Sequence, residues 1–147
     1  MNRLLVLTFA VMILALTSAA PAFAGVGLQT GLSLDPDNWL IGAHWKSKPL
    51  GDTSMFWVPS VEAGFGDVTM FAGNLDLHYD LKGDSKLYPY IGGGATLNWF
   101  DTGGDDDLEF GGSLLGGIQL SPKMFFETKF GLGDVPDWKF LIGWHAK

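Results

Sequence analysis

The three histidines are the residues of this chain most able to do chemistry at neutral pH. They stand at positions 44, 78 and 145, and a neutral imidazole is both a general base and a common metal ligand. Nucleophilic catalysis would also need a serine or cysteine within hydrogen-bond reach of such a base. Two positions after the histidines stand Lys46, Asp80 and Lys147, with no G-x-S-x-G motif and no cysteine in the chain. The sequence therefore does not indicate a hydrolase.

A run of acidic residues between positions 101 and 109 could offer oxygen ligands to Ca²⁺ or another divalent cation. It contains Asp101, Asp105, Asp106, Asp107 and Glu109. The run lacks the ligand spacing of an EF-hand loop. Short runs of like charge are usually solvated segments, so we expect an acidic surface loop here and no metal or other cofactor.

The composition limits the chain to one domain and excludes nucleic acid as a partner. The 147 residues are 47% hydrophobic and include 21 glycines, and the net charge is −7. A phosphate-binding surface needs a basic stripe, which an acidic chain of this kind lacks.

The amino-terminal residues predict a secretory signal peptide. Arg3 is followed by an apolar run over residues 4–16 and by small residues that end in Ala22-Phe23-Ala24. The run is too short for a transmembrane helix, and the A-x-A ending predicts cleavage after Ala24. We therefore expect a signal peptide over residues 1–24 and a mature domain over residues 25–147.

Alternation of apolar and polar residues with a period of two dominates the mature domain, which predicts β-strands. The expected strands cover residues 26–34, 38–46, 55–66, 71–80, 87–100, 109–120, 125–132 and 137–147. Turn residues separate them, including Asp35-Pro36-Asp37, Gly66-Asp67 and residues 82–85. Pro59 interrupts its strand and favours a locally unpaired position. Eight strands joined by short turns predict an all-β, antiparallel, up-and-down barrel that closes on itself.

Three features indicate that the apolar face points outward, into lipid. The polar face holds most of the strand glycines, such as Gly92 and Gly94, as the narrow interior of an eight-stranded barrel requires. Aromatic residues gather near the strand ends, as in interfacial girdles. Phe71 and Tyr79 are eight steps of about 3.3 Å apart, so a strand tilted by about 40° covers roughly 20 Å of depth. The expected girdle comprises Trp39, Trp45, Trp57, Phe71, Tyr79, Trp99, Trp138 and Trp144.

The other face of each alternating strand points into the barrel, and we call its positions those of interior parity. Charged residues stand at several of these positions, where each costs several kcal/mol unless it is paired. The expected interior network comprises Glu62, Asp76, Glu109, Glu127, Lys129 and Lys139. Glu127 and Lys129 lie two residues apart on one strand face, so we expect them to pair, or Glu127 to reach Lys139. Neutralising Glu127 alone is then expected to leave a buried positive charge.

The three histidines share this interior parity. They would form a metal site only if their side chains converge. We expect them instead to fill the interior and to share hydrogen bonds with Asp76, Asp80 and Lys46.

The mature chain resembles the small eight-stranded outer-membrane β-barrels of Gram-negative bacteria. The segments that carry the resemblance are residues 61–66, 88–94, 110–123 and 126–129. Members of this group usually end on an aromatic residue that the assembly machinery reads, whereas this chain ends Trp144-His145-Ala146-Lys147, where Trp144 would substitute. Some barrels of this size are lipid A deacylases with a His-x-Ser pair, which is missing here.

The resemblance implies a monomer in the outer membrane, in contact with its lipid, its lipopolysaccharide and the assembly machinery. The expected function is a structural, adhesive or envelope-related role for a barrel with a filled interior and no catalysis. The alternatives are a secreted or periplasmic barrel that binds a small apolar ligand and, third, a lipid-modifying barrel enzyme.

Overall fold

A computed structural model describes residues 23–81 and 87–146 of the chain, and in them it contains eight β-strands. The predicted turn at residues 82–85 and most of the predicted signal peptide lie outside the described residues. No helix among the described residues is long and apolar enough to cross a membrane. The strands are β1 (Phe23–Leu34), β2 (Asn38–Ser47), β3 (Met55–Gly66), β4 (Thr69–Asp80), β5 (Tyr88–Asp101), β6 (Asp106–Ser121), β7 (Met124–Gly133) and β8 (Trp138–Ala146).

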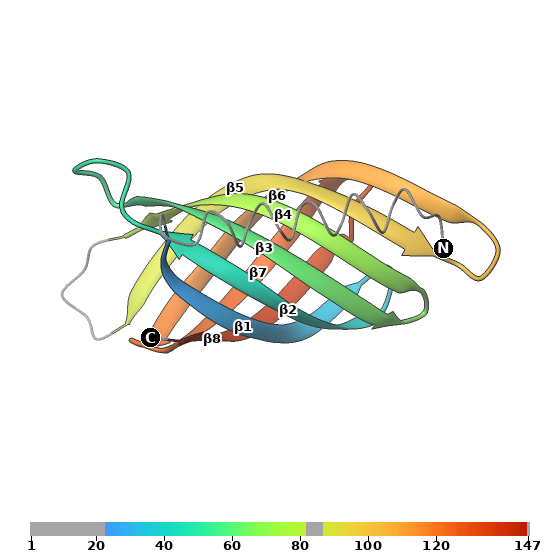
Figure 1. Ribbon diagram of the computed structural model, residues 1–147, viewed down its shortest axis with the longest axis horizontal. Coiled ribbons are helices and arrows are strands. Elements are labelled where there is room, and N and C mark those ends of the chain that lie inside the picture. The colour runs from blue at the N-terminus through green and yellow to red at the C-terminus, as the bar shows by residue number, and fades with distance from the viewer. Residues whose placement is uncertain (1–22, 82–86, 147) are drawn as a thin grey trace.

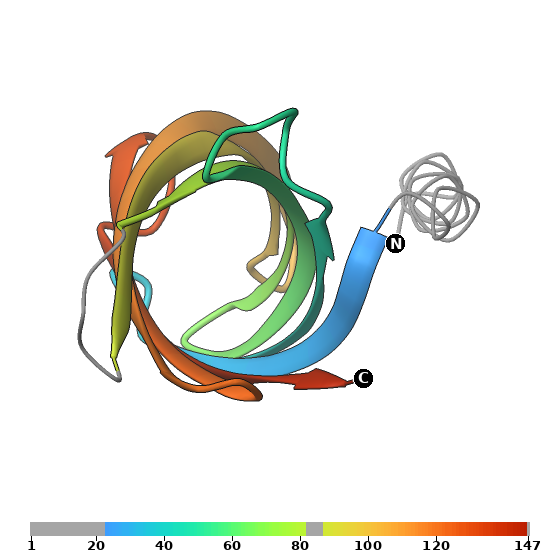
Figure 2. The same cartoon turned by 90° about the vertical axis from the view of Figure 1, so that its left-hand side faces the viewer.

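The strands form a closed antiparallel barrel, as predicted. Each strand pairs with the next along the chain, and β1 pairs with β8, which closes the sheet. Figure 1 shows the strands tilted against the long axis, and Figure 2 looks along the barrel from one end. Closure gives every strand two neighbours, so no free sheet edge remains.

The period-two pattern of the sequence is the pattern of burial in the barrel. In the middle of β4, Leu75 is 48% exposed, whereas its neighbours Asn74 and Asp76 are only 5% and 1% exposed. Successive side chains of a strand point to opposite faces. Most apolar side chains therefore cover the outside, and most polar ones face the interior.

The two ends of the barrel differ in their connections. We call the end with the connections 35–37, 67–68, 102–105 and 134–137 the loop end. The other, called the terminal end, carries Phe23, Ala146 and the connections 48–54 and 122–123. This end faces the viewer in Figure 2. The two ends fix the depth of each side chain along the barrel.

Two local predictions have different outcomes. Pro59 lies just beyond the end of the β2–β3 ladder, whose last pair is His44 and Ser60. It is paired with Leu75 on β4, so the predicted unpaired position is confirmed on the β2 side alone. The predicted acidic loop is wrong in its extent. The β5–β6 ladder continues to the Asp101–Asp106 pair, and only residues 102–105 are outside the strands. Backbone pairing extends the hairpin through residues whose side chains are solvated.

Candidate functional site

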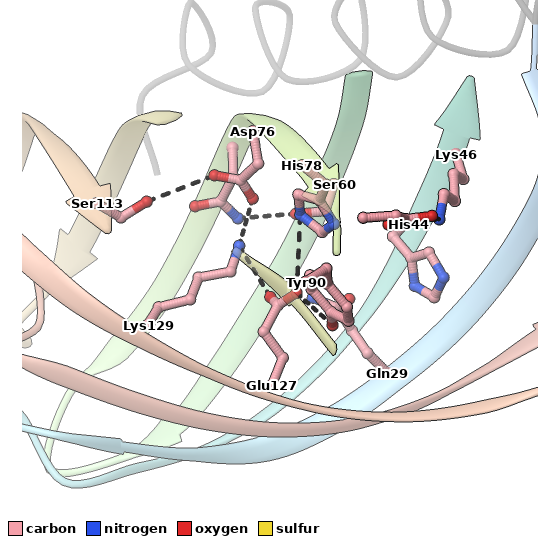
Figure 3. Close-up of polar contacts among 12 residues, drawn as sticks. Gln29, His44, Lys46, Ser60, Asp76, His78, Tyr90, Ser113, Glu127 and Lys129 are labelled. Carbon is pink, nitrogen blue, oxygen red and sulfur yellow. Dashed lines mark hydrogen bonds and ion pairs between the residues drawn. The ribbon is translucent and has the colours of Figure 1, made fainter. Parts of the chain in front are cut away.

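Two ion pairs cross the barrel interior. Lys129 Nζ on β7 lies 2.5 Å from Asp76 Oδ2 on β4, and Lys139 Nζ on β8 lies 2.7 Å from Glu62 Oε2 on β3. Neither pair joins neighbouring strands, so each spans the interior, as Figure 3 shows for Lys129 and Asp76. All four residues are at most 4% exposed. Buried charges of this kind are tolerated only when they are paired and hydrogen-bonded.

Neutral polar groups complete both pairs. Gln29 Nε2 donates to Glu62 Oε1 at 2.8 Å, and Ser113 Oγ donates to Asp76 Oδ1 at 3.4 Å. Next to them, Asn74 donates to Ser60 at 3.0 Å and accepts from Thr96 at 2.9 Å. These bonds tie most of the strands to one another through the interior.

Glu127 is bound differently from the other two interior carboxylates. Its Oε2 accepts a hydrogen bond from the Tyr90 hydroxyl at 2.8 Å, and its Oε1 is 3.6 Å from Lys129 Nζ. The expected contact between Glu127 and Lys129 is therefore present, but it is longer than the contact of Lys129 with Asp76. Side chains two residues apart on one strand extend side by side, so the lysine reaches its short contact, Asp76, across the interior.

The histidines divide into two groups instead of converging. His44 Nε2 lies 3.0 Å from His145 Nδ1 near the terminal end. His78 stacks on Tyr90 with ring centroids 4.9 Å apart. The histidines were expected to form hydrogen bonds with Asp80 and Lys46. These two residues instead pair with each other, with Lys46 Nζ 3.2 Å from Asp80 Oδ2.

The three histidines therefore do not form a common site. In the part of the chain that the structure describes, no group of three or more His, Cys, Asp or Glu is placed to hold a metal ion. This applies to the histidines and equally to the acidic residues around the 102–105 turn.

Glu109 is the one predicted network residue that lies outside the network. It has the interior parity, but it is near the loop end and only partly covered, and it forms no ion pair with another described residue. The nearest charges that act on it are those of Asp107 and Asp134. Glu109 lies at a different depth along the barrel from Lys129 and Lys139, and the alternation of the sequence does not predict this depth.

An apolar cluster inside the loop end was not predicted. Leu40, Met70, Phe100 and Leu141 are buried against one another, and Val68 packs on them. Their interior parity follows from the strand pattern, and that was the signal in the sequence.

The 134–137 connection also enters this region, where Pro136 is buried. A Cβ on Gly131 would lie only 2.3 Å from the Pro136 carbonyl oxygen, so this position needs glycine.

Two small cavities lie inside the part of the barrel that the structure describes. One cavity of about 20 Å³ lies on the terminal side and is lined by the histidines, Tyr90 and Glu127. Another of about 10 Å³ lies on the loop side, between Lys129, Lys139 and Pro136. Each is about the size of one water molecule.

The predicted aromatic girdle divides into two belts on the outward face. Trp39 and Trp138 lie at the loop end, and Trp57, Tyr79 and Trp144 at the terminal end, all of them exposed. Phe71 is partly covered and stacks on Trp99 with ring centroids 5.4 Å apart. Trp45 and Trp99 have the same parity but are only 8% and 4% exposed. These two rings therefore offer little surface to a surrounding medium.

Comparison with known proteins gives the fold. No protein-family model matches the sequence, and no curated protein matches it. Among solved structures, the chain is similar to Neisserial surface protein A (NspA), with a TM-score of 0.58 and 13% identity over 84% of this chain and 94% of that one. It is also similar to the N-terminal β-barrel domain of Pseudomonas aeruginosa OprF, with a TM-score of 0.57 and 14% identity over 83% of this chain and 97% of that one.

The fold is that of the small eight-stranded outer-membrane barrels. The resemblance inferred from the residues is thus confirmed for the architecture. Sequence identities this low indicate a shared fold and do not indicate a shared function, because one fold hosts many functions.

Proposed function

We propose that the chain is an integral outer-membrane β-barrel with a filled interior and a structural or envelope-related role without catalysis. The observation that carries the proposal is the outward face of the barrel. Between the strand ends, the outward positions of the described strands carry no charged side chain. A charge at the middle of a lipid-facing strand costs about 2–4 kcal/mol, so this pattern is what a bilayer selects.

The interior argues against the alternative of a soluble carrier for an apolar ligand. Such a carrier has an apolar interior and a polar surface, whereas here five buried charges lie inside, those of Glu62, Asp76, Glu127, Lys129 and Lys139. The interior cavities have room for about one water molecule each. A larger cleft of about 600 Å³ lies at the rim of the terminal end, between Pro49, Tyr88 and Pro122.

The interior also supports a role without transport or catalysis. Eight strands leave a space that side chains can fill, and here the ion pairs and the apolar cluster occupy it. Four serines of the described residues are buried. Ser60 accepts from Asn74 and Ser113 donates to Asp76, while Ser33 and Ser47 donate to the backbone carbonyls of Pro36 and Lys48. All four hydroxyls are thus engaged with groups other than a histidine base.

The partners in this proposal are the lipid and lipopolysaccharide around the outward face and the assembly machinery that inserts the barrel. Trp144, which is exposed on the outside of the last strand, serves as the aromatic residue near the carboxyl end. The barrel acts as a monomer, because closure leaves no sheet edge for a second copy. The loop-end connections are short, which favours an envelope role over an adhesive one.

Membrane extraction tests the proposal. The full chain, with its predicted signal peptide, is expressed in a Gram-negative host, and the isolated envelopes are washed with concentrated salt and with alkaline carbonate. We expect the protein to stay with the outer-membrane fraction through both washes. Release into the soluble fraction would support the carrier and contradict the proposal.

A further inference from the structure

The buried charges inside the barrel do not balance. The five charged residues of the interior network that are at most 4% exposed are three carboxylates and two lysines, so full ionisation leaves one negative charge. A buried charge without a partner is costly, and such a group usually takes up a proton instead. The interior therefore requires one further positive charge.

The excess negative charge is located at Glu127. Asp76 and Glu62 each have a lysine ammonium within 2.7 Å and a second hydrogen bond. For Glu127, the nearest ammonium is 3.6 Å away, and its short hydrogen bond comes from the neutral Tyr90 hydroxyl. Glu127 is therefore the least compensated of the three carboxylates.

His78 is placed to share a proton with this carboxylate. The residue is 7% exposed, and its ring stacks on that of Tyr90. His78 Nε2 lies 3.7 Å from Glu127 Oε2 and has no hydrogen-bond partner. The cavity of about 20 Å³ that both side chains line has room for one bridging water. Figure 3 shows the histidine, the tyrosine and the carboxylate side by side.

We propose that Glu127 and His78 together bind one proton, which makes the buried interior of the barrel electrically neutral. A proton on Glu127 lets the carboxylic acid donate to His78 Nε2, and a proton on His78 gives an imidazolium that donates to the carboxylate. The proposal concerns the interior geometry and goes beyond the proposed envelope role.

The other groups around Glu127 and His78 are already paired, so this pair is the site that binds the proton. The charged and titratable groups that face it are Lys129 beside Glu127 on β7, Asp76 and Asp80 on β4, Tyr90 on β5, His44 and Lys46 on β2, Glu62 on β3 and His145 on β8. The Lys46–Asp80 pair cancels its own charge. His44 and His145 share a hydrogen bond with each other. Neither forms an ion pair with a carboxylate among the described residues, so a proton on them would not neutralise Glu127.

The proton couples the stability of the barrel to pH with a definite sign. In the unfolded chain an ordinary histidine has lost its proton above about pH 6.5 and a glutamate above about pH 4.3. A native state that keeps one proton above these values loses stability as the pH rises, by up to about tenfold in the unfolding equilibrium constant per pH unit.

The test compares wild type, Glu127→Gln and Glu62→Gln in urea unfolding from lipid vesicles between pH 7 and 9. We expect the unfolding constant of wild type to rise with pH and that of Glu127→Gln to stay flat, because glutamine needs no proton. Glu127→Gln keeps the Lys129–Asp76 pair and should fold as well as wild type at pH 9. The matched variant Glu62→Gln should be less stable at every pH, because Lys139 loses its only carboxylate at 2.7 Å.

Spectroscopy on folded protein gives a second, independent result. At pH 7.5 we expect either the infrared carbonyl band of a protonated carboxylic acid that Glu127→Gln removes, or the ¹⁵N NMR signal of an imidazolium that His78→Asn removes. The absence of both signals, together with the same pH dependence for wild type and Glu127→Gln, would overturn the proposal. Stability that follows the concentration of Na⁺ or K⁺ instead of pH would also overturn it and assign the site to an inorganic cation.

Discussion

Arginine at the middle of the outward face should destabilise the barrel far more than arginine at its rim. Leu75 lies near the middle of β4 and is 48% exposed, and Leu108 lies two residues after the start of β6 and is 55% exposed. Both leucines point outward, so the two substitutions differ mainly in depth. With about 2.5 Å of depth per residue in a tilted strand, Leu75 is ~13–15 Å from both strand ends, and Leu108 ~5 Å from the loop end.

The expected costs follow from this depth. Arginine near the midplane costs about 2–4 kcal/mol, and near the interface about 0–1 kcal/mol. Leu75→Arg should therefore lower the folding equilibrium constant by about 30- to 700-fold and Leu108→Arg by about fivefold at most. In a water-soluble barrel both positions would be surface sites, where substitutions usually change stability by less than about 0.5 kcal/mol.

Urea titration of refolded protein in lipid vesicles, followed by tryptophan fluorescence, measures both values. Leu75→Ala controls for the loss of the leucine side chain without adding charge. Similar small costs for the two arginines would refute the assignment of the outward face to lipid.

Three further outcomes follow from the closed barrel and from the filled interior that we propose. Unboiled protein should migrate differently from boiled protein on a denaturing gel, because a closed barrel with its backbone hydrogen bonds satisfied resists unfolding by detergent; identical migration would count against closure. Purified protein in planar bilayers should show no steady conductance, and reproducible single-channel steps would contradict a filled interior. Gly117→Ala should destabilise the barrel, since its Cβ would lie 2.2 Å from the Tyr90 ring, whereas Gly116→Ala has nothing within 4 Å and should be neutral; equal urea midpoints would argue against this packing.

The strand pattern could be predicted because it depends on local periodicity. Closure could be predicted because eight strands joined by short turns can form a complete barrel. Alternation along β4 places Leu75 outside and Asp76 inside whatever the other strands do. The identities of the ion pairs could not be predicted, because Lys129 and Asp76 meet across the interior and depend on the depth of β4 and β7 in the finished barrel. Parity alone assigned Glu109 to the network, and only its position near the loop end removes it. The cluster around Leu40 and Phe100 could not be predicted either, because it joins residues of β2, β4, β5 and β8 that meet only at one depth of the closed barrel.

Site-directed spin labelling along β4 tests the central claim most directly. The chain has no native cysteine, so single cysteines at positions 72–77 can be labelled without background. In vesicles, the account predicts a period of two, in which labels at 73, 75 and 77 are accessible to oxygen dissolved in the lipid and labels at 72, 74 and 76 are protected. Labels at 73, 75 and 77 that a water-soluble nickel reagent reaches as readily as oxygen would contradict a lipid-facing outer surface.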